Sequence, residues 1–237
     1  MRDLIVWGVI PARGGSKSIH RKNLCRIGDR TLVEWAARSA MTAKSLDRIL
    51  ASTDSREIRS VLEGVGIEVF QRRPDLASDD ARVEDAVLAL LRETTRQKCP
   101  DIIVLIQPTS PFVRAEHIDA AVDLLASNVG WNSIQTVVPV AHNSHFLNQR
   151  TISADGLVEF RFERERSVAF QKQQKPASWI FGNLVAVRVS SLVGGETFFA
   201  KPSGSLVVNR VTSLDIDELD DLEIGRAVYD AGLVSND

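Results

Sequence analysis

The first half of the chain alternates between short apolar runs and longer segments with the apolar spacing of an amphipathic helix. The runs, which predict strands, are 4–10, 49–53, 67–70, 102–106 and 133–138. The segments that predict helices are 31–43, 54–65, 80–92 and 115–126. The run 102–106 is apolar at every position, which is typical of a central parallel strand covered on both faces. Repeated strand–helix units predict a three-layer α/β fold, with a mostly parallel sheet between two layers of helices.

Composition limits the classes of protein that this chain can be. Its 237 residues, 44% of them hydrophobic, are enough for one domain with a full core and an appendage. The net charge of −2 gives no support for a nucleic-acid-binding surface. No window approaches the ~20 apolar residues that span a bilayer, and the first apolar run is too short for a signal peptide. Cys25 and Cys99 have neither metal-ligand spacing nor a disulfide framework, which fits a reducing cytoplasm. Taken together, these features lead us to expect a cytoplasmic protein without membrane or nucleic-acid partners.

The pattern changes between about 141 and 189, where polar loops and strand-like runs follow one another with no helix between them. Asp155 and Gly156 are typical of a hairpin turn, so we expect an antiparallel arm on a single domain that spans 1–237. Trp179, Ile180 and Phe181 are more apolar bulk than one face of a small hairpin can bury. They either close over a site or pack on another subunit. The chain then returns through a strand at 206–208 to a last helix at about 218–231.

A glycine-rich, basic loop follows the first strand, at residues 11–23. Gly14 and Gly15 let the backbone approach a ligand and point N–H groups at its oxygens. The loop also carries Ser16 and four basic side chains, Arg13, Lys17, Arg21 and Lys22. It has neither the P-loop spacing nor the dinucleotide-binding spacing of glycines. Since ligands of parallel sheets bind at the carboxyl ends of strands, the loop predicts a polyphosphate site of another kind, with an ordinary turn as the alternative.

Residues 10–23 resemble the signature of the CMP-sugar synthetases, the acylneuraminate cytidylyltransferases that activate sialic and related acids with CTP. The chain departs from that signature at Ser18 and His20, where the family has Gly and Pro. The resemblance implies a Rossmann-like sheet of the nucleotide-diphospho-sugar transferase type, with a small antiparallel dimerisation arm. It implies that Arg13, Lys17 and Lys22 stabilise charge on the triphosphate. The nucleotide contacts that it implies in this loop are Ala12, Arg13, Gly14, Gly15, Ser16, Lys22 and Asn23.

Asp215 and Asp217 predict a cation site. Residues two apart in an extended segment point to the same side, and Mg²⁺ takes one or two carboxylates together with substrate phosphates and water. Capping of the last helix is an equally good local explanation of this acidic pair. Residues 213–222 resemble the family's metal-binding segment, which implies that the pair holds Mg²⁺. Asp220 and Asp221 are read as acids in the first turn of the helix.

Three further segments follow strands and match the family. Gln107, Thr109 and Ser110 come after the central strand, and the resemblance implies that they contact the acceptor. Ser52 ends an earlier strand and Arg73 follows the next one, and the resemblance implies that both contact the nucleotide. The local alternatives are a plain turn at 107–111, capping at Asp54 and Ser55, and a solvated arginine pair at 72–73.

The arm departs from the family. Lys172 stands where the family has an arginine, and lysine lacks the bidentate fork that suits a carboxylate. Phe198 and Phe199 match paired aromatic residues that sialate-activating members place beside the sugar. His142 and His145 have no Cys or carboxylate beside them, so they are a poor metal site. The changes spare the CTP half of the motif set and fall on the acceptor half.

We therefore expect an enzyme, a Mg²⁺-dependent cytidylyltransferase. A hydroxyl of a sialic-acid-like nonulosonate would attack the α-phosphate of CTP and release pyrophosphate, and the family's members are homodimers. One alternative is the same reaction on another acid, such as a phosphonate or a different keto-deoxy sugar acid. The other is a nucleotide-binding module without catalysis. No side-chain general base is evident in the sequence.

Overall fold

The computed structural model describes residues 4–94, 99–169 and 171–234. Its centre is a seven-stranded sheet with the order β11-β7-β10-β6-β1-β4-β5. All neighbouring strands are parallel except for β10, which runs antiparallel to both β6 and β7. The strands are β1 (Val6–Pro11), β4 (Arg48–Thr53), β5 (Glu68–Gln71), β6 (Ile102–Ile106), β7 (Ser133–Pro139), β10 (Trp179–Arg188) and β11 (Ser203–Val207). The predicted mostly parallel sheet is confirmed, and β6 occupies the predicted range with every residue buried.

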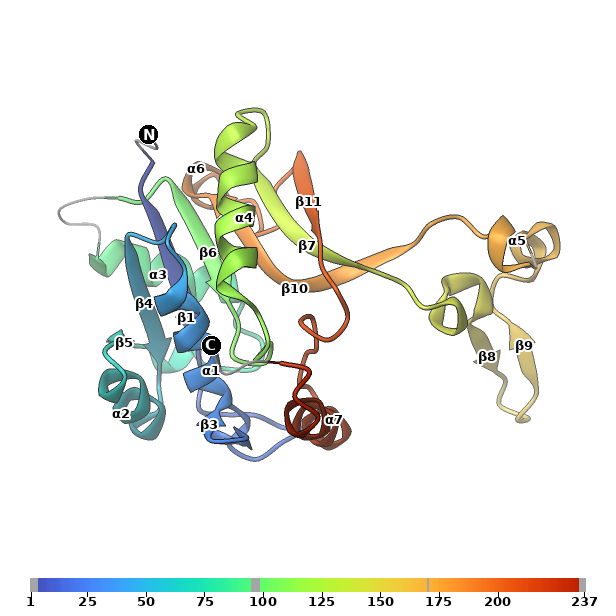
Figure 1. Cartoon of the computed structure of the whole chain (residues 1–237), viewed down its shortest axis with the longest axis horizontal. Helices are drawn as coiled ribbons and strands as arrows, with labels where there is room; N and C mark the ends of the chain where they lie inside the picture. Colours follow the sequence, from blue (N-terminus) through green and yellow to red (C-terminus); the bar gives the residue numbers. More distant parts are fainter. Residues whose placement is uncertain (1–3, 95–98, 170, 235–237) are drawn as a thin grey trace.

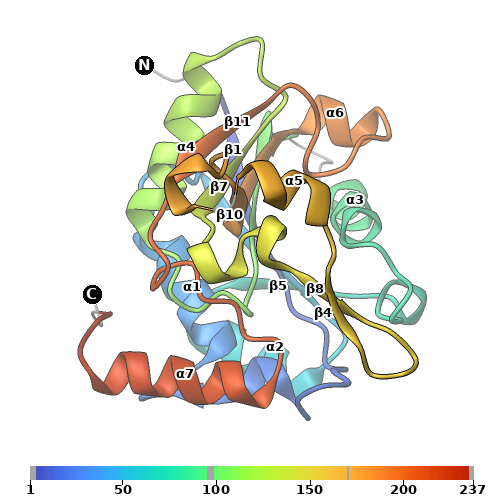
Figure 2. The ribbon, with the colours of Figure 1, turned by 90° about the vertical axis from the view of Figure 1, so that its right-hand side faces the viewer.

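Helices cover both faces of this sheet, as Figure 1 and Figure 2 show, so the predicted three-layer architecture is confirmed. One face carries α1 (Leu32–Thr42), α2 (Arg56–Gly64) and α4 (Ala115–Ser127), whose apolar sides form a common core with β1 and β6. The other face carries α3 (Val83–Thr94) and the short α6 (Val189–Val193). The last helix, α7 (Leu219–Asp230), packs on the small hairpin of β2 (Arg26–Ile27) and β3 (Arg30–Thr31).

Local capping chemistry sets where the first helices begin. Thr31 accepts a hydrogen bond from the backbone of Glu34 and Glu34 reaches back to Thr31, which is a capping box at the start of α1. Ser55 caps α2 by accepting from the backbone N–H of Ile58 at 3.4 Å. Of the two caps considered for this helix, Ser55 is the one that the structure uses, and Asp54 is free for another contact.

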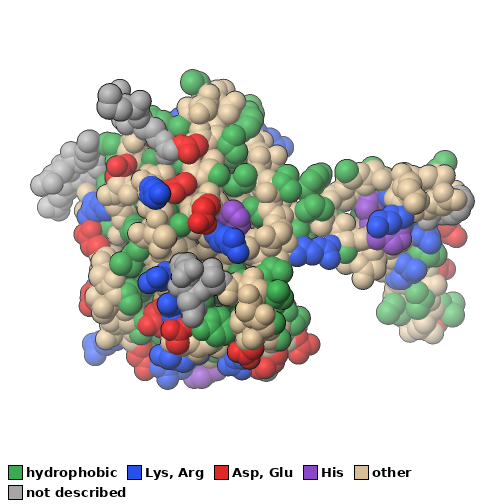
Figure 3. Space-filling view, in the orientation of Figure 1, with side chains coloured by type: hydrophobic (Ala, Val, Ile, Leu, Met, Phe, Trp, Pro, Cys, Tyr) green, Lys and Arg blue, Asp and Glu red, His purple; other side chains and the backbone are tan. Residues whose placement is uncertain are grey.

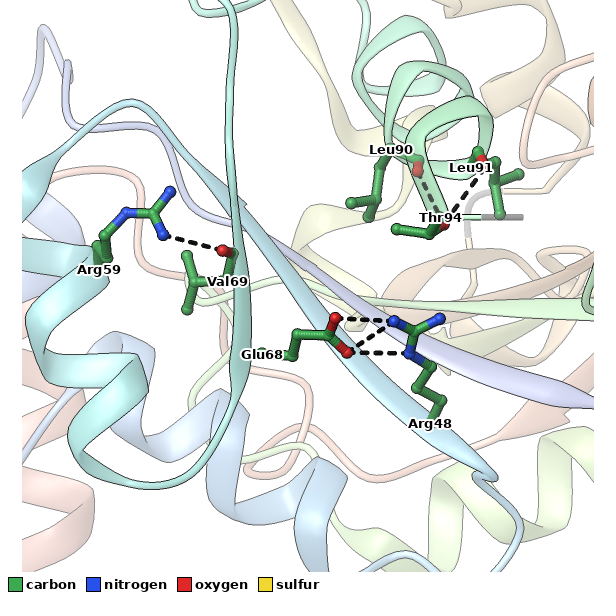
Figure 4. A network of polar contacts seen from close by, with 7 residues as sticks. All are labelled: Arg48, Arg59, Glu68, Val69, Leu90, Leu91 and Thr94. Atoms are coloured by element: carbon green, nitrogen blue, oxygen red, sulfur yellow. Dashed lines mark hydrogen bonds and ion pairs between the residues drawn. The ribbon is translucent and has the colours of Figure 1, made fainter. Parts of the chain in front are cut away.

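Polar side chains connect β4, β5 and α2 at the edge of the sheet (Figure 4). The Arg48 guanidinium on β4 makes a forked ion pair with Glu68 on β5, with N–O distances of 2.8 to 3.0 Å. The Arg59 side chain on α2 donates to the carbonyl of Val69 at 2.9 Å, which joins the helix to the same strand. These contacts hold β5 in register at an edge where it has a single strand neighbour.

The arm extends away from the body between β7 and β10 (Figure 1). It contains the hairpin of β8 (Arg150–Ile152) and β9 (Val158–Phe160), in which Gly156 takes a φ of 80° at the predicted turn. Its helical segments are η3 (His142–Ser144), η4 (Phe146–Asn148), α5 (Glu163–Val168) and η5 (Lys172–Gln174). The arm thus includes a short helix that the sequence pattern did not predict.

The return strand β10 also differs from expectation, because it belongs partly to the body. Trp179 to Phe181 pair with the end of β7, whereas Leu184 to Arg188 pair with β6 and, at Val185 to Val187, with β7 as well. We expected the arm to reach about 189, but residues 184–188 lie in the central sheet. They do so because Leu184 to Val187 are apolar on both faces and are buried between two strands. None of the helices in the described part of the chain is both long and apolar enough to cross a membrane.

Candidate active site

A cavity of about 470 Å³ opens where the loop after β1 meets the carboxyl ends of the neighbouring strands. The loop contributes Arg13, Gly15, Ser16, Lys17, Ser18, Lys22 and Asn23 to its wall. Gln107 and Thr109, which follow β6, and Asp217 close other sides. Further lining residues are Ser78, Asp79, Ala81, Arg82 and Val83. The cavity is therefore lined by several of the residues that the motifs predicted, drawn from segments far apart in the chain.

The two glycines of the loop, Gly14 and Gly15, have different surroundings. The backbone N–H of Gly14 donates to Oδ1 of Asp54 at 2.8 Å, and a Cβ at this position would lie 2.9 Å from Cβ of Ser55. Gly14 is thus required by close packing, and in this structure its N–H points at Asp54 rather than into the cavity. A Cβ on Gly15 would meet nothing within 4 Å, and Gly15 and Ser16 both line the cavity. Ala12 is fully buried behind the loop.

The side chain of Asn23 also stabilises the loop. Its Nδ2 donates to the carbonyl of Arg13 at 2.8 Å. The backbone N–H of Ala12 donates to the carbonyl of Ser52 at 3.0 Å, which continues the β1–β4 pairing into the loop. The loop is therefore held in shape before any ligand enters, as a preorganised anion site requires.

The four basic side chains of the loop point in different directions. Arg13 and Lys17 both contact Asp79, at 2.9 and 2.7 Å. Lys22 contacts Asp217 instead, with its Nζ 3.0 Å from Oδ1. Arg21 pairs with Glu57 on α2 and is not among the described residues that line the cavity. Three of the four cations, Arg13, Lys17 and Lys22, therefore face the space where phosphates would bind.

The acidic pair, Asp215 and Asp217, lies beside Lys22, and Ile216 between the two acids holds this segment in place. Ile216 is fully buried and its N–H donates to the carbonyl of Thr109 at 2.7 Å, which fixes this segment against the loop after β6. Asp215 and Asp217 therefore flank one anchored residue and share the opposite side. Asp217 does not cap the helix, because the N-cap of α7 is Glu218. Asp221 accepts from the backbone N–H groups of Asp217 and Glu218, as expected of a first-turn acid.

Asp215 has an unusual environment for a carboxylate. Although the residue as a whole is accessible, desolvation of its carboxyl group raises its pKa above the ordinary value, and the nearby charge of Asp217 raises it further. Hydrogen bonds from Thr109 and from Ser110, whose Oγ lies 3.1 Å away, together with the charge of Lys22, act in the opposite direction. Two carboxylates that repel each other and lie beside the cavity of the basic loop are a donor set that suits a hard divalent cation. The residues present fit Mg²⁺.

The structure revises two assignments near this pair. Ser110, predicted to contact the acceptor, is 1% exposed and its hydroxyl is directed at Asp215, so it positions that carboxylate. Gln107 and Thr109 do line the cavity. Ser52, predicted to contact the nucleotide, is 5% exposed and contacts Arg72, with its Oγ 3.3 Å from Nε.

At the adjacent pair of arginines, Arg72 lines the cavity, whereas the sequence predicted that Arg73 would do so. Arg72 is 7% exposed, lines the cavity and donates to the carbonyl of Ser52 at 3.0 Å, and its burial lowers its pKa. Arg73, the predicted nucleotide contact, is exposed and pairs with Asp75 at 2.8 Å, away from the main cavity. The alternation of side chains along β5 was the signal that could have distinguished them, since Arg72 follows Phe70 on the face that is paired with Ser52.

The predicted acceptor residues of the arm and its base are not gathered at the cavity of the same chain. Lys172 lies on the arm in η5. Phe198 is 1% exposed within the core on the α3 face, so its side chain offers no surface to a ligand. Phe199 is 43% exposed and packs edge-on against Phe181, with ring centroids 5.3 Å apart. Figure 3 shows apolar side chains where the arm leaves the body, and Lys, Arg and His side chains along the arm.

The side chain of His145 stabilises the arm. Nε2 of His145 lies 3.0 Å from the carbonyl of Pro176 and 3.1 Å from the hydroxyl of Ser178, and its Nδ1 accepts from the backbone of Leu147. Within residues 4–94, 99–169 and 171–234, no group of three or more His, Cys, Asp or Glu side chains is placed to hold a metal. Sequence reasoning also missed Asp79 and Arg82, which line the cavity, because nothing in the local pattern separates them from other surface charges.

Comparison with known proteins identifies the family of this chain. Residues 7–177 match the family model described as Cytidylyltransferase. A CMP-N,N'-diacetyllegionaminic acid synthase from Legionella pneumophila is 28% identical over 215 residues, which are 90% of each chain. A post-translational flagellin modification protein B from Campylobacter coli is 30% identical over 218 residues, which are 89% of each chain. The solved structure of a CMP:2-keto-3-deoxy-manno-octonic acid synthetase complexed with CTP has the same fold, with a TM-score of 0.74 at 14% identity over 96% of this chain and 99% of that one. The chain belongs to the cytidylyltransferase family.

Proposed function

We propose that this protein transfers CMP from CTP to the hydroxyl of a sialic-acid-like nonulosonate, with Mg²⁺, and releases pyrophosphate. The observation that carries this proposal is the meeting of Lys22 and Asp217 at 3.0 Å, beside the Gly15–Ser16 backbone, in one cavity of about 470 Å³. A triphosphate needs cations and backbone N–H groups on one side, and carboxylates for its metal on the other. The proposal is supported by Arg13, Lys17 and Lys22 from the loop and by Asp217 from the segment before α7, all of which line the cavity.

The chain's own residues would act by positioning and charge neutralisation. The acceptor hydroxyl forms a bond to the α-phosphorus of CTP while the bond from that phosphorus to the bridging oxygen of the β-phosphate breaks. Arg13, Lys17 and Lys22 neutralise the negative charge that builds up on the departing pyrophosphate. Gln107 and Thr109, which also line the cavity, would orient the acceptor. The hydroxyl proton passes to solvent.

Asp215 and Asp217 are the residues that would hold Mg²⁺, with Thr109 and Ser110 orienting the first carboxylate. When bound, the metal supplies Lewis-acid polarisation of the α-phosphate and neutralises triphosphate charge. Since Asp217 is also the partner of Lys22, the same carboxylate connects the cation site to the phosphate loop.

The acceptor class rests on relatives that match most of this chain, among them the legionaminic acid synthase. Lys172 in place of the family's arginine favours a second candidate, the same reaction on a different acid, because lysine binds a carboxylate as a point charge. We also propose a cytoplasmic homodimer. Trp179, Ile180 and Phe181 are 49%, 57% and 39% exposed at the root of the arm, which is more apolar surface than a monomer's arm would leave uncovered.

The test is pyrophosphate release from CTP with a panel of acceptors in the presence of Mg²⁺. The panel contains N-acetylneuraminate, N,N'-diacetyllegionaminate, 3-deoxy-manno-octulosonate and a phosphonate. Turnover with either nonulosonate, abolished by EDTA and lowered at least about 100-fold in Asp217→Ala, is the expected result. Asp220→Ala is the matched control, since Asp220 is an exposed acid in the first turn of α7, three residues further along the chain, and does not line the cavity. Turnover with another acid alone would move the proposal to the second candidate, and turnover in EDTA would overturn the metal role.

A further inference from the structure

One acidic residue, Asp79, holds two of the basic side chains that the phosphate loop presents to the cavity. Its Oδ1 lies 2.9 Å from Nη1 of Arg13 and its Oδ2 lies 2.7 Å from Nζ of Lys17. The Arg13 guanidinium also donates to the carbonyl of Ser78 at 3.2 Å. Each carboxylate oxygen thus takes a different cation. Two oxygens of a phosphate group would engage the same two side chains in the same way.

Asp79 is part of the cavity wall, together with the two cations that it contacts. The hydrogen bond from Lys17, and then the charges of Lys17 and Arg13, lower the pKa of its carboxyl group, so the group is an anion at neutral pH. The free protein therefore already holds a negative charge in the part of the cavity where phosphate oxygens would bind. Lys22 differs, because its partner is Asp217 on another segment.

We propose that Asp79 is a built-in counter-ion that competes with the phosphates of CTP, and with departing pyrophosphate, for Arg13 and Lys17. This inference rests on the proposed function for the identity of the nucleotide. Arg13 and Lys17 retain other N–H donors, but a phosphate that approaches these two cations meets the negative charge of Asp79 beside them, so the two anions repel each other and compete for the same side chains. When pyrophosphate leaves, Asp79 forms both contacts again, and this lowers the affinity of the site for the product.

The exposure of these side chains permits that exchange. The Asp79 side chain is 44% exposed and that of Lys17 is 81% exposed, so both can turn into solvent without opening the core. Ion pairs this exposed are individually weak, because water solvates the separated charges well. Asp79 therefore reduces phosphate affinity by a modest factor rather than blocking the site. A ligand without phosphates does not compete with it at all.

The experiment measures binding by titration calorimetry, without acceptor, for the full chain and two variants. The ligands are inorganic pyrophosphate, CTP and cytidine. Asp79→Asn removes the charge of the counter-ion, and Asp80→Asn is the control, because Asp80 is the next residue, is also exposed, and makes neither contact. We expect Asp79→Asn to bind pyrophosphate and CTP about three- to tenfold more tightly, with cytidine unchanged and with less than about a twofold effect of Asp80→Asn.

Two results would overturn the proposal. Unchanged or weaker binding by Asp79→Asn would mean that Asp79 orients Arg13 and Lys17 for the phosphate instead of competing with it. Equal tightening in Asp79→Asn and Asp80→Asn would mean that any negative charge near the rim has the same effect. Asp79→Ser, which has neither the carboxylate of Asp nor the amide of Asn, repeats the comparison. Tighter pyrophosphate binding without turnover on any acceptor would support the counter-ion and contradict the proposed reaction, and turnover without tightening would do the reverse.

Discussion

Nζ of Lys22 lies 3.0 Å from Oδ1 of Asp217, although 195 positions separate the two residues in the chain. This pair joins the loop after β1 to the segment that precedes α7. The Lys22 side chain is 13% exposed, whereas that of Lys17 in the same loop is 81% exposed. Because a charge that is shielded from water interacts more strongly with a ligand, the two lysines are not equivalent.

The first prediction compares these lysines. We expect Lys22→Ala to lower kcat/KM for CTP about 100-fold, as for loss of a charge-assisted hydrogen bond of about 2–3 kcal/mol in a partly enclosed site. Lys17→Ala should cost about tenfold or less, because its charge is largely solvated. Steady-state pyrophosphate release measures both, with Lys44→Ala, an exposed lysine that does not line this cavity, as the control. Equal losses of kcat/KM at Lys17 and Lys22 would show that the exposure of a lysine does not determine its contribution to the reaction.

The second prediction concerns the pH dependence of stability at Asp215. Its pKa is raised from 3.8, mainly by desolvation, so the folded protein keeps this proton to a higher pH than the unfolded chain does. The free energy of unfolding therefore falls as the pH rises from about 3.8 through the raised pKa. We expect Asp215→Asn to be more stable than the wild type at pH 7 without Mg²⁺. The gain should shrink as the pH is lowered toward 3.8.

Urea unfolding between pH 4 and pH 8 measures this effect, with Asp220→Asn as a control for general charge removal. Added Mg²⁺ should stabilise the wild type and leave Asp215→Asn largely unchanged, because a bound cation removes the repulsion between Asp215 and Asp217. A variant that is equally stable at pH 7 would contradict the assigned direction of the pKa shift.

The third prediction distinguishes the neighbouring arginines. Arg72 is buried, bonds to Ser52 through its side chain and lines the cavity, whereas Arg73 is exposed and pairs with Asp75. We expect Arg72→Ala to destabilise the protein by about 2–3 kcal/mol, because hydrogen bonds from a charged group are lost, and to weaken CTP binding as well. Arg73→Ala should change stability by less than about 0.5 kcal/mol. Thermal unfolding and CTP titration measure the two variants side by side, and a larger effect at Arg73 would restore the assignment made from the sequence.

The fourth prediction tests the homodimer. Ile180 is 57% exposed in a row of three large apolar residues, whereas Ile224 on α7 is 51% exposed without such neighbours. We expect sedimentation to report a dimer for the wild type and for Ile224→Asp, and a monomer for Ile180→Asp, because a buried unpaired charge is costly at an interface. A monomeric wild type would refute the dimer and leave these residues to close over a site instead.

Local patterns were sufficient for much of the fold. The apolar run at 102–106 is the strand β6, and the spacing of apolar residues in 115–126 is the helix α4 with one further residue. The antiparallel insertion of β10 between β6 and β7 was not predictable in the same way. Its partners lie at least 40 residues away in sequence, and a strand buried on both faces has the same apolar composition in either direction.

The sequence by itself determined the order of strands and helices and the chemical types at their ends, because periodicity, capping and turn chemistry act between near neighbours. It supplied a basic glycine loop and an acidic pair, each recognisable from its own residues. Only the tertiary structure decided which charges meet. Lys22 contacts Asp217, and Arg13 and Lys17 contact Asp79, because the strand order brings loops from distant parts of the chain to one edge of the sheet. The same strand register places Arg72 rather than Arg73 at the cavity, because Arg72 follows Phe70 on the side that is paired with Ser52.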